Sequence, residues 1–177
     1  MNRIDHIRLM ASYNQWMNSR LHEVTASLSD EALCQERGAF FGSIVGTLNH
    51  LLAGDIIWLQ RFARHPSRHL ALQPVRKMAA PRGLSQLLFG QFNEMSQQRA
   101  LLDQVIVEWA QALSEADLDI VLHYTNTAGN PFARNFYSLL THFFNHQTHH
   151  RGQTTTLLSQ AGVDVGSTDL LNLIPTL

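Results

Sequence analysis

The sequence predicts an all-α fold, a four-helix bundle, and three observations support this prediction. Apolar residues recur at spacings of three and four along four long segments of the 177-residue chain, the pattern of helices that bury one face. Only one short segment alternates apolar and polar residues as a strand would. No repeat, low-complexity tract or linker divides the chain, so residues 1–177 are expected to form a single domain.

The four predicted helices have recognisable ends. Ser43 precedes the second segment and suits an N-cap, while Gly162 follows the last and suits a C-terminal cap. A short helical turn is expected between the first two long helices, at residues 29–34. The long helices are predicted at residues 4–28, 44–64, 84–113 and 135–160.

The connections differ in kind. Pro66, Pro74, Pro81 and Gly83 interrupt a long connection between the second and third helices, as expected where two neighbouring helices run parallel rather than form a hairpin. Residues 120–131 alternate in polarity and end in a Thr-Ala-Gly-Asn turn, which predicts a small β-hairpin before the last helix.

Composition excludes several classes of function. Charged residues make up 15% of the chain and the formal net charge is −1, so no overall field attracts nucleic acid or an anionic membrane. No apolar stretch is long enough for a membrane span, and no export signal is expected at the N-terminus. Cys34 is the single cysteine, which excludes an internal disulfide and fits a reducing compartment. We expect a cytoplasmic protein.

Histidines gather in the last predicted helix. The chain has ten, and four of them lie within nine positions, at His142, His146, His149 and His150. His146 and His150 are four residues apart, so both side chains leave one helix face and could bind one metal ion. His142 and His146 share that spacing, but only His150 lies within the apolar arc, with His146 on its shoulder. The alternative is a pair of core histidines satisfied by ordinary hydrogen bonds.

Two residues of the second helix compete as the third ligand. Asp55 points into the main apolar arc, where a carboxylate must be either paired or a metal ligand. His50 lies off that arc and would need the helix to have a second buried face. Periodicity alone leaves the third ligand as His50 or Asp55.

Two segments resemble the DinB/YfiT-like superfamily of metalloenzymes. These are the run Asn-His-Gln-Thr-His-His-Arg-Gly-Gln at residues 145–153 and the segment around His50 at residues 48–59; residues 13–18 and 169–171 also fit. The resemblance implies an up-up-down-down bundle with a long crossover connection. It also implies one metal ion held by His50, His146 and His150, with Asp55 beside the ligands rather than among them.

Three imidazoles leave coordination positions open, as in catalytic metal sites. Zinc or nickel is expected, and iron or manganese also suits imidazole. Gln153, three residues after His150, is a candidate for orienting a ligand. Such a site predicts a metal-dependent enzyme with a small-molecule substrate. The resemblance implies a transferase or isomerase that uses a low-molecular-weight thiol, and hydrolysis by metal-bound hydroxide is the rival reaction.

Two further expectations concern assembly and class. The alternative to an enzyme is a non-catalytic, stress- or damage-inducible bundle that binds a metal or a partner. Apolar residues on more than one face of the second helix, together with the resemblance, predict a homodimer. No Glu-x-x-His pair and no His-Glu-x-x-His run is present, so di-iron and zinc-protease chemistry are not expected.

Overall fold

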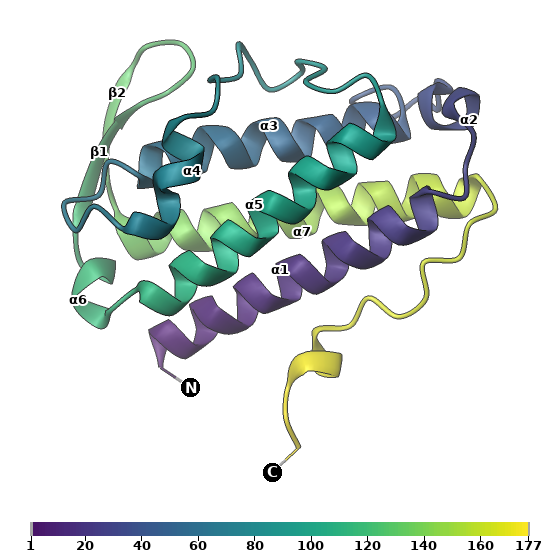
Figure 1. The fold of residues 1–177 in the computed structure, drawn as a ribbon. Coiled ribbons are helices and arrows are strands. Elements are labelled where there is room, and N and C mark those ends of the chain that lie inside the picture. The colour runs from purple at the N-terminus through teal and green to yellow at the C-terminus, as the bar shows by residue number, and fades with distance from the viewer. Residues whose placement is uncertain (1, 177) are drawn as a thin grey trace.

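In the computed structural model, which describes residues 2–176, most of the chain is helical, as predicted. Four long helices lie alongside one another (Figure 1): α1 (Arg3–Thr25), α3 (Ile44–Phe62), α5 (Phe92–Ala112) and α7 (Phe136–Gln160). Shorter elements connect or follow them: α2 (Asp30–Cys34), a 3-10 turn at Leu70–Leu72, α4 (Gln73–Arg76), α6 (Glu115–Leu118) and a 3-10 turn at Leu170–Leu173.

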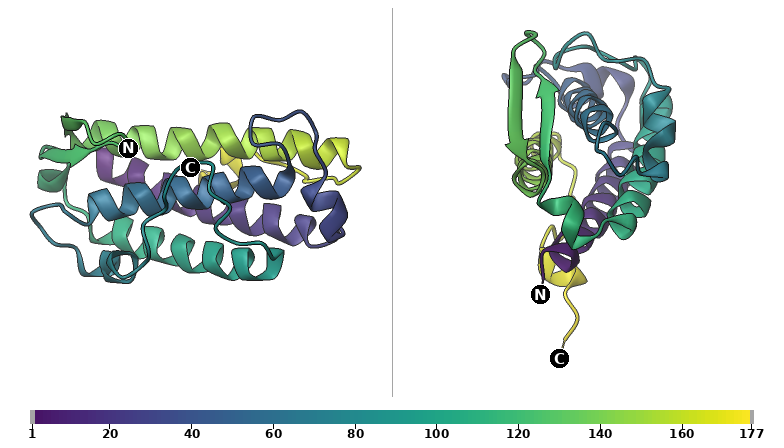
Figure 2. Two further views of the ribbon diagram at one scale, coloured as in Figure 1. Left: turned by 90° about the horizontal axis from the view of Figure 1, so that it is seen from above. Right: turned by 90° about the vertical axis from the view of Figure 1, so that its left-hand side faces the viewer.

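Contacts between α1 and α5 show that these two helices are antiparallel. Arg8, early in α1, donates to the carbonyl oxygen of Gln111, late in α5. His22, late in α1, is 3.0 Å from the hydroxyl of Ser96, early in α5. The helices α3 and α7 are antiparallel in the same way, and Figure 2 shows all four from two further sides.

The helices α3 and α5 run parallel. Asn49 contacts Met95 near the start of both, and Phe62 stacks on Trp109 near the end of both. This confirms the parallel pair that the long connection predicted. The up-up-down-down order implied by the resemblance is wrong, because the short path through α2 returns the chain antiparallel to α1 and the crossover then joins α3 to α5. The observed order is up-down-down-up.

Side-chain caps set the helix ends at several predicted places. Ser43 accepts a hydrogen bond from the backbone N–H of Gly46 at the start of α3, as expected. Asn135 caps α7 by accepting from Ser138, and Gly162 follows its end with φ of 80°. The predicted hairpin is present as β1 (Val121–Thr125) paired antiparallel with β2 (Pro131–Asn135).

The third helix begins later than predicted, at Phe92 rather than Leu84. Residues 84–91 are held in a non-helical path by α3. The side-chain oxygen of Asn49 accepts from the backbone N–H groups of Leu88, at 2.8 Å, and of Phe89, at 2.9 Å. These tertiary hydrogen bonds use donors that a helix would need, so the apolar spacing of this segment does not produce one.

A buried polar network crosses the middle of the core. Arg99 of α5 pairs with Asp55 of α3 at 2.5 Å and with Asp103 one turn along α5 at 2.9 Å. Asn14 and Asn18 of α1 donate to the same Asp103 carboxylate. Asp55 is therefore the paired carboxylate that its place in the apolar arc required.

The helix α3 is buried on almost every side. Its main apolar arc faces the core, and its other face is covered by α7, the crossover and the hairpin. Trp58, on that other face, contacts His142 of α7 and Tyr124 of β1. No helix within residues 2–176 combines the length and apolar character that crossing a membrane requires.

Replacing Asp55 with alanine should lower the free energy of unfolding by about 3 kcal/mol, because it leaves the buried Arg99 guanidinium short of one partner. Urea unfolding measures the change. Arg3, whose ion pairs with Glu115 and Asp119 are exposed, is the control, and Arg3→Ala should cost much less. An equal decrease in the free energy of unfolding in the two variants would contradict a larger contribution from the buried pair.

Candidate metal centre

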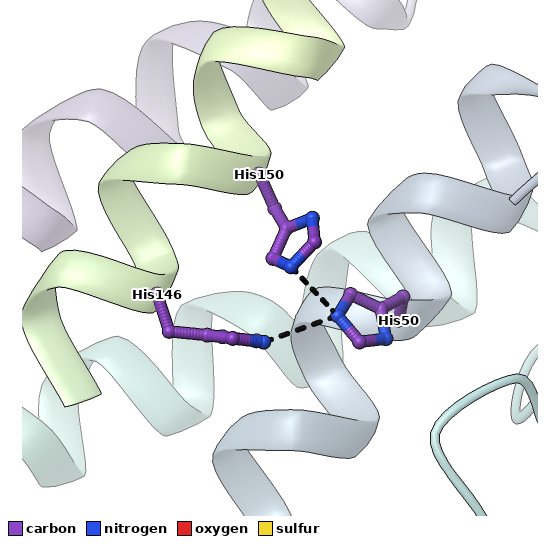
Figure 3. Close-up of side chains that lie close together, drawn as sticks. All are labelled: His50, His146 and His150. Atoms are coloured by element: carbon purple, nitrogen blue, oxygen red, sulfur yellow. Dashed lines mark hydrogen bonds between the residues drawn. The ribbon is translucent and has the colours of Figure 1, made fainter. Parts of the chain in front are cut away.

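The packing of α3 against α7 brings the three predicted histidines together (Figure 3). His50 comes from α3, and His146 and His150 come from successive turns of α7. The second buried face of α3 accounts for His50, whose exposed fraction is 3% although it lies off the main apolar arc. Its ring stacks on Phe41, with centroids 3.8 Å apart.

The ring nitrogens converge on one small volume. Nε2 of His50 lies 3.1 Å from Nε2 of His146 and 3.0 Å from Nε2 of His150. Metal–nitrogen bonds of about 2.0–2.1 Å in a tetrahedron place neighbouring ligand nitrogens about 3.3 Å apart. The observed spacing fits such a site after small adjustments.

Neighbouring acceptors fix the tautomers of two of these rings. His50 donates its Nδ1–H to the carbonyl oxygen of Leu84 at 2.9 Å. His150 donates its Nδ1–H to Oε1 of Gln153 at 2.8 Å, so the residue that the sequence offered for orienting a ligand contacts this ring. In the neutral rings both protons are therefore on Nδ1, and both Nε2 atoms carry lone pairs.

The three imidazoles favour the neutral form. Burial is the largest cause lowering the pKa of His50, His146 and His150, and neighbouring histidines lower all three further. The pKa of His146 falls to about 3. Two lone pairs, on His50 and His150, thus face each other at 3.0 Å without a proton between them. A cation at the centre would relieve that repulsion, and the donor set suits a divalent metal.

Gly54 makes room for the ligand geometry. It lies one turn after His50, and a Cβ atom added there would be 3.0 Å from Cε1 of His146. That distance is shorter than ordinary van der Waals contact, so a larger residue would push the His146 ring away from His50. Glycine is required here for close approach of the helices rather than for backbone conformation.

The other predicted candidates lie elsewhere. Asp55 is engaged by Arg99 and is not among the converging groups, so the structure decides against it as the third member of the cluster. His142 and His149 are exposed, as the helical phase predicted. Sequence reasoning missed the supporting roles of Phe41, in the loop before α3, and of Asn49, which holds the crossover, because contacts with loops leave no periodic signal.

Comparisons with known proteins find matches over most of the chain. A sequence profile described as "DinB family" matches residues 1–176. The chain belongs to the DinB family. It is 28% identical over 158 residues to "Protein DinB" of Bacillus subtilis (strain 168), an alignment that covers 89% of this chain and 87% of the relative. No solved structure matches the chain.

In this DinB-family chain, Gly54→Ala should weaken zinc binding at the three histidines at least tenfold, because the new methyl group displaces His146. Competition titration against a zinc-binding dye measures the dissociation constant. Gly152→Ala on α7 is the matched control, since a Cβ there meets nothing within 4 Å. If both variants bind zinc as the parent does, the close approach at Gly54 does not position the site.

Proposed function

We propose that His50, His146 and His150 bind one divalent metal ion, zinc or nickel, and that the chain is a metal-dependent enzyme. The observation that carries this proposal is the 3.0 Å contact between two Nε2 atoms whose protons are held elsewhere. Ordinary hydrogen bonding between core histidines does not account for it, since neither atom is a donor in the neutral rings.

The surroundings of the three histidines suit a small-molecule substrate. His146 and His150 are only partly buried, so the site has an open side. Phe41 meets His150 edge-on, and Phe40, which is 86% exposed, packs against Phe41. These two rings offer an apolar wall beside the ligands for the non-reacting part of a substrate.

A divalent ion held by three imidazoles would lower the pKa of a thiol or water bound to it. The helices that carry the histidines favour the thiol. Asp55 is the single carboxylate in α3 and α7 together, and Arg99 engages it, so neither helix supplies a free general base for water. A transferase or isomerase that uses a low-molecular-weight thiol is therefore our proposal, with hydrolysis as its rival.

Other expectations remain proposals. Antiparallel and parallel contacts among the four long helices support a four-helix bundle as the scaffold of the site. A homodimer stays a prediction. The second apolar face of α3, on which that prediction partly rested, is covered within the chain. Cytoplasmic location also stays a prediction.

Replacing either His146 or His150 with alanine should remove one equivalent of bound zinc relative to the parent, because two imidazoles hold the ion far less tightly than three. Metal analysis after dialysis gives the stoichiometry, and circular dichroism checks that each variant is folded. His149→Ala is the matched control, since His149 is an exposed neighbour on the same helix. Unchanged zinc content in both site variants would contradict the ligand set.

Zinc- or nickel-loaded protein should catalyse attack of a small thiol on an activated alkyl halide, releasing the halide and a proton. His150→Ala should reduce the rate at least a hundredfold, while His149→Ala should leave it near the parent value. Ester hydrolysis without any thiol would favour the rival reaction. Stoichiometric metal with no turnover in either assay would favour a non-catalytic metal-binding role.

A further inference from the structure

A second cluster of side chains that could hold a metal ion lies just beyond the C-terminal end of α3. His65 and His69 belong to the start of the crossover that follows α3, and Asp117 belongs to α6 (Figures 1 and 2). All three are buried. His65 is fifteen residues after His50, which corresponds to about 20 Å along the direction of α3, so the two clusters cannot share an ion.

The tautomer of His65 leaves a lone pair facing the cluster. Its Nε2–H donates to the backbone carbonyl oxygen of Asp117 at 3.2 Å, so Nδ1 has no proton in the neutral ring. A backbone carbonyl that accepts from the far nitrogen is a common support for a metal-bound histidine. Nδ1 lies 3.9 Å from the Asp117 carboxylate and accepts one hydrogen bond, from the backbone N–H of Ser67 at 3.2 Å.

One ring nitrogen of His69 is buried without a hydrogen-bond partner among the described residues. Its Nε2 has no hydrogen-bond partner within residues 2–176, although the residue is only 9% exposed. The Asp117 carboxylate oxygen is 3.9 Å away, too far for a hydrogen bond. Burial lowers the pKa of His69, and the positive charges of His65 and Arg76 lower it further, although the negative charge of Asp117 acts to raise it. An unpaired polar atom in the interior calls for a partner.

Asp117 supplies the negative charge. Burial acts to raise its pKa, but hydrogen bonds from Ser67 and Ser114 outweigh that effect and hold the pKa at about 2. Ser114 occupies Oδ2 through its backbone N–H and its hydroxyl, whereas Ser67 alone donates to Oδ1, at 2.5 Å. Oδ1 therefore keeps one lone pair, on the side of the two histidines.

We propose that Nδ1 of His65, Nε2 of His69 and Oδ1 of Asp117 bind a second divalent ion, with zinc best matched to two imidazoles and a carboxylate. One ligand atom from each of the three residues lies within 4.8 Å of the other two. Tetrahedral zinc needs neighbouring ligand atoms about 3.3 Å apart, so the 3.9 Å separations must shorten by about half an ångström. The ion replaces one long hydrogen bond, from Ser67 to His65, and gives His69 its missing partner.

Such an ion would fasten the crossover to α6. Two ligands come from residues that follow α3, and the third lies in the connection between α5 and β1. The same crossover later supplies the Leu84 carbonyl oxygen that orients His50. The second site is thus placed to stabilise the long connection, and its role is structural rather than catalytic.

The test is a zinc titration of four proteins stripped of metal. They are the parent, His69→Phe, the double variant His146→Ala/His150→Ala, and a triple variant that combines these three substitutions. His69→Phe keeps a ring for the contacts with His65 and Trp109 but has no nitrogen. His22→Phe is the matched control, because His22 is 8% exposed and belongs to neither cluster. Circular dichroism reports folding, and His69→Gln replaces His69→Phe if the latter does not fold.

We expect two zinc equivalents in the parent and in His22→Phe, one in His69→Phe, one in the double variant and none in the triple variant. In the double variant, zinc should also slow proteolytic cleavage within residues 63–91, and His69→Phe should remove that protection. A folded double variant that binds no zinc would overturn the second site and leave the first intact. If the parent binds one zinc equivalent, and His69→Phe but not the double variant loses it, the site at His50, His146 and His150 would be overturned instead.

Discussion

The arrangement of the groups around the three histidines depends on the contact between Nε2 of His50 and Nε2 of His150. Both rings donate through Nδ1, to Leu84 and to Gln153, so their facing nitrogens repel each other unless a cation lies between them. Burial lowers the pKa of both rings and disfavours a proton as that cation. The chain thus maintains a geometry that is unfavourable by itself and favourable around a metal ion.

Several parts of the fold maintain that geometry. The parallel arrangement of α3 and α5 requires the long crossover, and the crossover provides the Leu84 carbonyl oxygen. Asn49, next to His50, holds the end of the same crossover through two backbone N–H groups. The ion pair of Arg99 with Asp55 joins α5 to α3 and engages the single carboxylate of α3. The geometry of the three histidines and the packing of the core therefore depend on the same helices.

The sequence predicted the helices and the α7 pair well, because periodicity records burial directly. His146 and His150 followed from spacing and apolar phase. His50 came from the resemblance alone, since its burial depends on Phe41, the crossover and α7, which cover a second face of α3. The predicted start of α5 was too early, because the backbone N–H groups before Phe92 donate to Asn49 instead of to a helix. The order of helix directions was also wrong, because it depends on the short path through α2, which apolar spacing does not record.

The proposed metal ion lies among three imidazole nitrogens from α3 and α7. Anomalous diffraction at the zinc absorption edge, from crystals grown with zinc, locates the ion directly. We expect an anomalous peak about 2.0–2.1 Å from Nε2 of His50, His146 and His150. An ion bound through Asp55, or no peak among the three histidines at saturating zinc, would contradict it.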